Sequence, residues 1–261
     1  MDLNKFFYLL LYIMFNLDKI GRPIARIDGG KNDKKIISLS DADESNGFKN
    51  IRLKEGKFSH IPNTDQERDI LYITGPSGSG KSWYANTYIK NYKKAHPKNN
   101  IYMFSPVIED ESISSDIKRV KLDNRMVTDP LKIGELAESL VIFDDVDVIK
   151  DKKLRDAVYA LLNEVLEVGR HIKVSCIITN HLPTNGKETR RMLNEAHSIT
   201  YFPAAGSKVQ LNRLLEQYIG MDKKDIKKAK QSGSRWVTVF KNYPQFVMTE
   251  NEMYLLSTDD E

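Results

Sequence analysis

Cysteine is nearly absent from this chain of 261 residues, which contains only Cys176. A single thiol cannot form an internal disulfide, so a small disulfide-stapled fold is excluded and a reducing compartment is expected. The sequence also lacks internal repeats and low-complexity tracts. The excess of positive charge is small, with a net charge of +4. Such a balance permits a nucleic-acid partner without indicating one.

Long hydrophobic runs are missing as well. The most apolar stretch, Phe6–Phe15, has ten residues, whereas a membrane-spanning helix needs about 20. A signal peptide is disfavoured because only Lys5 precedes the run as a basic residue and no small-residue cleavage site follows it. We therefore expect no stable membrane span. Two interpretations stay open: a short buried helix or partner-docking segment, or translation that starts at Met14.

What the sequence does contain divides into four parts. Residues 1–20 form the short apolar N-terminal segment. Residues 21–65 carry short strand-like runs separated by turn signals such as "DGGKND", and we interpret them as a small β-rich annex. Residues 66–205 alternate strand and helix patterns. Residues 206–261 are predicted to contain helices and a β-hairpin that pack on this core, with the hairpin turn near Asn242–Tyr243.

The alternation in the third part predicts the fold class. Apolar strand-like runs at 69–75, 100–106, 139–144 and 174–178 are separated by helical patterns, of which 152–168 is the clearest amphipathic stripe. This rhythm is typical of an α/β fold in which helices cover a mostly parallel sheet. Gly169 stands where a glycine can end the amphipathic helix.

A glycine-rich motif lies between the first of these strands and the following helix. It fits the pattern G-x-x-x-x-G-K-[ST] of a P-loop NTPase. Its glycines let backbone N–H groups point at phosphate oxygens, and the helix adds its positive end. Lys81 is expected to reach the β- and γ-phosphates of ATP, and Ser82 to offer its hydroxyl to Mg²⁺. The predicted ATP-binding residues are Gly75, Pro76, Ser77, Gly78, Ser79, Gly80, Lys81 and Ser82.

Two adjacent acids follow a second apolar strand in "SLVIFDDVD". Asp144 suits a carboxylate on the Mg²⁺ side of the nucleotide. Asp145 suits a base or water-orienting group for attack on the γ-phosphate, although many hydrolysing P-loop enzymes have the longer Glu there. Asp147 is interpreted as an ordinary loop acid. A solvated acidic loop is the alternative, which the glycine-rich motif makes the weaker one.

A third segment, "EVGRHIKVSCIITNHLPT", places Arg170 after a helix and ends a buried strand in Thr179, Asn180 and His181. With the two motifs above, it resembles the FtsK/HerA superfamily of P-loop motor ATPases. Within that superfamily it is most similar to the virion DNA-packaging ATPases of large cytoplasmic DNA viruses, of which the poxvirus enzymes are one type. The resemblance covers about residues 65–205.

The resemblance implies several expectations. The sensor strand lies between the P-loop strand and the acidic strand, so Asn180 faces the γ-phosphate, with His181 as the other candidate. Arg170 acts in trans on the site of a neighbouring subunit, or else is a cation at a helix end. The implied partners are double-stranded DNA, capsid or portal-vertex proteins and further copies of the chain in a ring. The implied location is the cytoplasm of an infected host cell, or the virion.

Other functions remain open at this stage. A nucleoside or nucleotide kinase shares the P-loop, although "SPVIEDESISSDI" offers no arginine for its substrate. A scaffold that binds nucleotide without hydrolysis and an export or assembly ATPase of the same superfamily are further alternatives. A basic helix predicted at Lys223–Lys230 could contact phosphates or simply be a solvated face.

Overall fold

The structure is a computed structural model that describes residues 13–42, 44, 47–64, 68–107, 117–184 and 186–256. Most of the apolar run at Phe6–Phe15 and much of the segment at 105–117 fall outside these ranges. Within them, every helix is too short or too polar to cross a bilayer.

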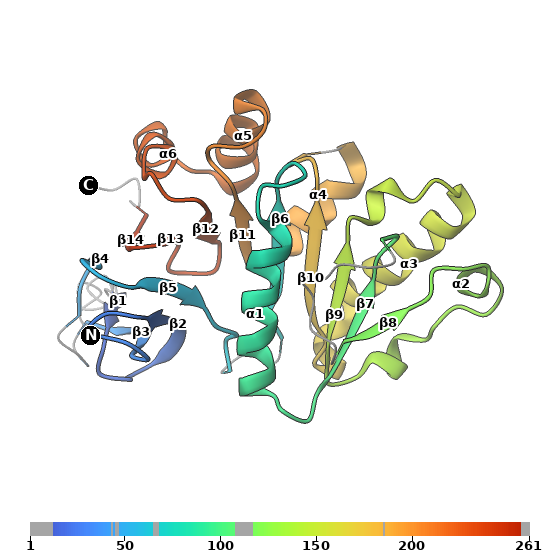
Figure 1. Ribbon diagram of the computed structural model, residues 1–261, viewed down its shortest axis with the longest axis horizontal. Coiled ribbons are helices and arrows are strands. Elements are labelled where there is room, and N and C mark those ends of the chain that lie inside the picture. The colour runs from blue at the N-terminus through green and yellow to red at the C-terminus, as the bar shows by residue number, and fades with distance from the viewer. Residues whose placement is uncertain are drawn as a thin grey trace, which may run out of the picture.

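A large sheet of ten strands forms the centre of the molecule (Figure 1). Six neighbouring strands run parallel, and the expected α/β fold is confirmed. Their order is β11 (Ser198–Tyr201), β6 (Ile70–Thr74), β10 (Ser175–Asn180), β9 (Ser139–Asp144), β7 (Asn100–Phe104) and β8 (Lys118–Val120). Because β10 lies between β6 and β9, the ends of these three strands meet at one edge of the sheet.

Antiparallel strands from both ends of the chain extend the sheet beyond β11. The predicted hairpin is β12 (Val237–Phe240) with β13 (Phe246–Thr249), and β12 pairs directly with β11. Two strands absent from the prediction follow, β14 (Glu252–Leu255) and β4 (Asn50–Arg52). The last part of the chain is therefore continuous with the core sheet and is not an appendage on its surface.

Helices cover the two faces of the sheet unequally. Helix α1 (Lys81–Ala95) packs on the face that carries Leu71 and Ile73, whereas Ile70 and Tyr72 point to the opposite face. Such alternation is inherent in a strand. The opposite face is covered by α3 (Lys152–Val168), α4 (Gly186–Glu195), α5 (Lys208–Arg213) with the π-helical turn Leu214–Ile219, and α6 (Lys223–Lys230), while the short α2 (Arg125–Thr128) contacts α3. Figure 1 shows α1 in front of the sheet.

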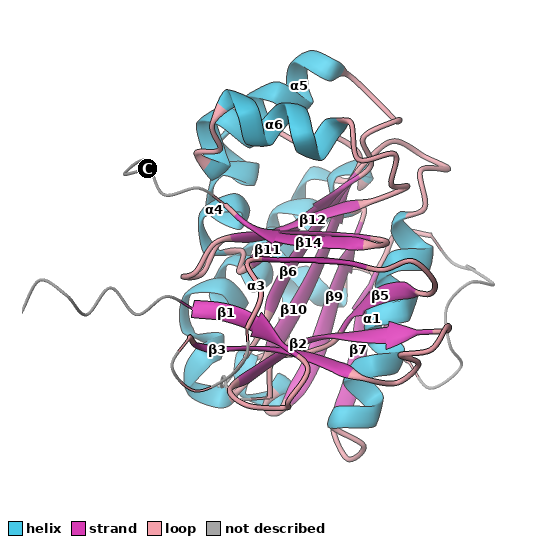
Figure 2. Ribbon diagram, turned by 90° about the vertical axis from the view of Figure 1, so that its left-hand side faces the viewer, coloured by secondary structure: helices cyan, strands magenta, loops and turns pink. Residues whose placement is uncertain are grey.

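A second, four-stranded antiparallel sheet lies beside α1 on the same face (Figure 2). Its order is β1 (Ile13–Asn16), β3 (Ile36–Asp41), β2 (Arg22–Asp28) and β5 (Lys57–His60). Three of the strand-like runs expected in residues 21–65 are thus β2, β3 and β5 of this sheet. For the part of the N-terminal run that is described, the expected helix is wrong: residues 13–16 form an edge strand, and Phe15 is buried 5.5 Å from the ring of Phe246.

Buried polar contacts fasten the small sheet to α1. The Tyr84 hydroxyl lies 3.2 Å from His60 Nδ1 and 2.7 Å from Thr238 Oγ1, and Asn91 donates to the His60 carbonyl at 2.8 Å. Burial lowers the pKa of His60 to about 4, with the charge of Asp69 opposing the shift. The annex and the core are thus joined through hydrogen bonds to the imidazole and the backbone carbonyl of His60, as well as through apolar packing.

Candidate active site

The glycine-rich loop connects β6 to α1 in a conformation that requires its glycines. Gly78 and Gly80 have φ angles of 76° and 113°, in the left-handed region that side chains disfavour. A Cβ on Gly75 would come within 2.7 Å of Ser79 Oγ and 2.9 Å of the Phe202 ring. Phe202, at the end of β11, is buried beneath the loop. The loop is therefore a tight turn that opens onto the N-terminus of α1.

Lys81 is the first residue of α1 and its side chain turns back over the loop. It is only 7% exposed, and its Nζ donates to the Gly75 carbonyl at 3.0 Å. The same atom lies 3.6 Å from Asp145 Oδ2, so the lysine bridges the loop and the acidic strand. A buried ammonium group at a helix N-terminus concentrates positive charge where phosphate would lie.

Asp144 ends β9 with both carboxylate oxygens oriented. Thr179 Oγ1 lies 2.7 Å from Oδ1, and Ser105 donates to Oδ2 at 2.9 Å. Burial raises the pKa of Asp144 above its usual value, and the neighbouring charge of Asp145 adds to this, while the hydrogen bonds from Thr179 and Ser105 oppose it. The group therefore gains from a nearby cation that would stabilise its ionised form.

Asp145 turns away from the strand with a left-handed φ of 45°. Its N–H lies 3.2 Å from the Thr179 carbonyl and 3.0 Å from Thr179 Oγ1, and that hydroxyl is 3.2 Å from Asp145 Oδ1. Thr179 therefore orients both acids, a role that the sequence analysis did not assign. The available signal was strand register, since Thr179 stands directly opposite Asp144 across β9 and β10.

The two candidate sensor residues are the last residue of β10 and the residue that follows it, and their side chains have different partners. The Asn180 amide, 2% exposed, donates to the Tyr72 hydroxyl at 3.1 Å and packs against Met192, on the face away from α1. His181 instead contacts Lys81 and Asp145. Its Nδ1 is 3.4 Å from Lys81 Nζ, and its Nε2 is 3.1 Å from Asp145 Oδ2. The Asn180 side chain is therefore not beside Lys81 and Asp145, and His181 is the residue that contacts both.

The residues expected to bind Mg²⁺ have suitable chemistry. The Ser82 hydroxyl and the Asp144 carboxylate are hard oxygen donors at the loop and at the acidic strand. No group of three or more His, Cys, Asp or Glu side chains able to hold a metal occurs among the described residues. Two oxygen donors are enough for Mg²⁺, which usually takes one or two protein ligands and completes its shell with phosphates and water.

Arg170 lies far from this cluster within the same chain. It follows α3 in the 3₁₀ turn Gly169–Ile172, is exposed, and precedes the first residue of β10, whereas Lys81 and Asp145 lie beyond its last. At about 3.3 Å per residue, the strand alone separates the two ends by about 17 Å. Gly169 caps the C-terminus of α3 as expected, with a right-handed φ of −57°, and Lys173 ends the following 3₁₀ turn in a left-handed conformation.

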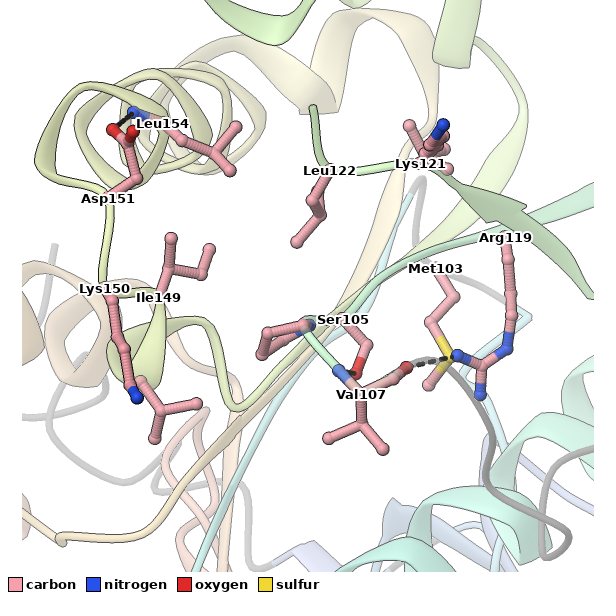
Figure 3. Close-up of a pocket in the computed structure, with 13 residues that line it drawn as sticks. Met103, Ser105, Val107, Arg119, Lys121, Leu122, Ile149, Lys150, Asp151 and Leu154 are labelled. Atoms are coloured by element: carbon pink, nitrogen blue, oxygen red, sulfur yellow. Dashed lines mark hydrogen bonds between the residues drawn. The ribbon is translucent and has the colours of Figure 1, made fainter. Parts of the chain in front are cut away.

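A separate hollow of about 700 Å³ opens beside the acidic edge (Figure 3). Ser105, Val107, Ile149 and Leu154 are among the residues on its wall, and Arg119 donates to the Val107 carbonyl at 2.7 Å. Ser105 connects this hollow to Asp144. Its mostly apolar lining does not suit a triphosphate.

The predicted basic helix is α6, and some of its lysines have partners inside the chain. Lys228 lies 3.7 Å from Glu252 and over the Tyr254 ring, and Lys230 donates to Asn212. Lys224 and Lys227 line a groove of about 420 Å³ together with Arg52. Some lysines of α6 are therefore paired within the chain, and others line a cationic groove.

Comparison with known proteins identifies one relative in sequence. The chain is 41% identical over 241 residues to protein V3 of Sputnik virophage, covering 90% of this chain and 96% of that one. No protein-family model matches the sequence.

Solved structures resemble the chain in fold. The genome packaging NTPase B204 of Sulfolobus turreted icosahedral virus 2, in complex with AMP, is 17% identical with a TM-score of 0.52, covering 71% of this chain and 98% of that one. The pCW3 conjugation coupling protein TcpA is 12% identical with a TM-score of 0.51, covering 88% and 77%. Both likenesses concern the FtsK/HerA-type P-loop fold, which confirms the resemblance at that level; the poxvirus type stays a prediction.

Proposed function

Since this chain belongs to the family of the Sputnik virophage protein V3 and has the FtsK/HerA-type P-loop fold, we propose that it is an ATP-hydrolysing motor that packages double-stranded viral DNA into a capsid. The proposal is supported by neighbours in fold whose names describe genome packaging and conjugation coupling. One of them, B204, has also been solved in complex with ATP-gammaS.

The observation that carries the proposal is the convergence of three strand ends. Lys81 after β6, Asp145 after β9 and His181 after β10 lie within 3.6 Å of one another through their side chains. They come from segments far apart in the sequence, so the fold alone brings them together. A cation, a carboxylate and an imidazole around one phosphate-binding loop are suited to hydrolysis of a phosphoanhydride bond.

Each group has a role that its contacts support. Lys81 and the loop N–H groups bind the β- and γ-phosphates, and Ser82 with Asp144 would hold Mg²⁺, which when bound neutralises phosphate charge. Asp145 orients the attacking water. His181 links Asp145 to Lys81, with its Nε2 3.1 Å from Asp145 Oδ2 and its Nδ1 3.4 Å from Lys81 Nζ. It is thereby placed to respond to the γ-phosphate.

Arg170 is proposed to serve the site of a neighbouring subunit. Its own site is beyond reach at the other end of β10, whereas its exposed position lets it face another copy of the chain. An arginine supplied in trans would stabilise the charge of the transition state. The motor would then work as a ring, and capsid or portal proteins would be its docking partners.

ATP turnover measured with and without linear duplex DNA tests the proposal. We expect DNA to raise the Mg²⁺-dependent rate by about tenfold, because binding to the track favours the arrangement of subunits that completes each site. A mixture of nucleosides in place of DNA serves as the matched test of the kinase alternative. Stimulation by a nucleoside with formation of its phosphate, and none by DNA, would contradict a packaging motor.

A further inference from the structure

A cationic side chain from the C-terminal part of the chain lies against the phosphate-binding loop. If Gly80 carried a Cβ, that atom would lie 3.4 Å from Arg235 Nη2 and 3.5 Å from its Nε. The guanidinium group therefore lies beside the loop at the residue that precedes Lys81, on the side where Phe202 Cε1 would be 3.2 Å from the same Cβ. Nothing in the sequence motif predicts this, because Arg235 belongs to the antiparallel extension of the sheet.

The backbone at Arg235 is held firmly, although its side chain is exposed. Its N–H donates to Glu250 Oε2 at 2.9 Å, and the preceding Ser234 hydroxyl donates to the Trp236 carbonyl at 2.6 Å. Trp236 is buried with its ring 5.0 Å from that of Tyr84 on α1. The position of Arg235 relative to α1 is thus fixed from both sides in the chain.

Across the described ranges of the chain, the Arg235 guanidinium group makes no hydrogen bond and no ion pair. Glu250, whose carboxylate it approaches electrostatically, is bound by Lys57 at 2.8 Å and by the Arg235 N–H. Guanidinium groups form bidentate contacts with phosphate. A free one beside a phosphate-binding loop therefore has a suitable partner in a bound nucleotide.

The strand order decides which part of the nucleotide it would meet. Lys81, Asp145 and His181 gather on the β10 and β9 side of β6, where the γ-phosphate would lie, whereas Arg235 precedes β12 on the β11 side. The nucleotide must extend away from the acids on that second side. We propose that Arg235 is a binding residue of the same subunit's site that contacts the α- and β-phosphates, which ADP and ATP share.

This inference rests on the proposed nucleotide site, and its test separates the two. Arg235→Ala should weaken ADP and ATP binding alike, by about tenfold, because it removes a contact to groups that both nucleotides carry. KM for ATP should rise by a similar factor while kcat stays within about twofold. This pattern is expected when the lost contact binds the ground state and the transition state equally strongly. Arg235→Lys should retain part of the affinity.

Calorimetric titration of each variant with ADP and with ATP is the measurement. Arg125→Ala is the control variant, because Arg125 on α2 is an exposed arginine remote from the loop. Without nucleotide the melting temperature should change little, since the side chain makes no hydrogen bond or ion pair with the residues that the structure describes; if the alanine variant folds poorly, Arg235→Gln replaces it. ADP affinity within twofold of wild type, or a loss of kcat at unchanged affinity, would overturn the assignment. If Lys81→Ala also bound ADP normally, the nucleotide site itself would be wrong.

Discussion

Replacing Lys81 by alanine is expected to weaken ATP binding by about 100-fold and to abolish measurable turnover, because it removes the buried cation of the phosphate site. The lysine also holds the Gly75 carbonyl and faces Asp145, so its loss leaves that carboxylate near the phosphates without compensation. Like charges would then meet in a half-buried space. The effect should therefore exceed that of losing a surface contact.

Titration with ATP, followed by calorimetry, measures this effect. Lys90→Ala is the matched control, because Lys90 is an exposed lysine on the same helix, and it should bind ATP as the wild type does. Lys81→Met, which keeps most of the aliphatic stem, separates loss of charge from loss of packing. ATP affinity unchanged in both Lys81 variants would show that the glycine-rich loop does not bind the triphosphate.

Replacing Asp145 by asparagine is expected to reduce turnover by about 10³-fold while ATP still binds within about threefold. Asparagine has the same shape, tolerates the left-handed φ of 45°, and can keep the contacts with Thr179, so the backbone should not move. What it lacks is the negative charge, 3.1 Å from His181 Nε2, that we propose orients the attacking water. The variant should therefore trap ATP on the protein.

A filter-retention assay with labelled ATP and Mg²⁺ distinguishes trapped ATP from released ADP. Asp147→Asn is the control, since Asp147 lies two residues further along and is predicted to be an ordinary loop acid; it should retain most of the activity. Normal turnover in Asp145→Asn, or an equal loss in both variants, would assign water orientation to another group.

The residues that sequence alone could identify are those constrained by local chemistry. The motif from Gly75 to Ser82 needs only a strand before it and a helix after it, and both were visible as periodic patterns. The acid pair was identified only together with that motif, since alone it would fit a solvated acidic loop. The position of β10 between β6 and β9 was implied by the resemblance to the FtsK/HerA superfamily.

The remaining features depend on which face a side chain takes and on pairing between distant segments. Asn180 and His181 are adjacent in sequence, yet strand alternation turns the first toward Tyr72, and the chain leaving β10 directs the second toward Lys81. The pairing of β4 with β14 joins the beginning of the chain to its end. Arg235 reaches Gly80 only because β12 is added beside β11. No local pattern encodes these contacts.

Movement along DNA is the central claim, and displacement of a third strand from duplex DNA measures it most directly. A triplex-forming oligonucleotide is bound to linear duplex DNA, and its release is followed by fluorescence after ATP is added. The account predicts release that requires ATP and Mg²⁺, fails with a non-hydrolysable analogue, and is lost in Asp145→Asn. Steady ATP hydrolysis on the same DNA with no release of the oligonucleotide would contradict it.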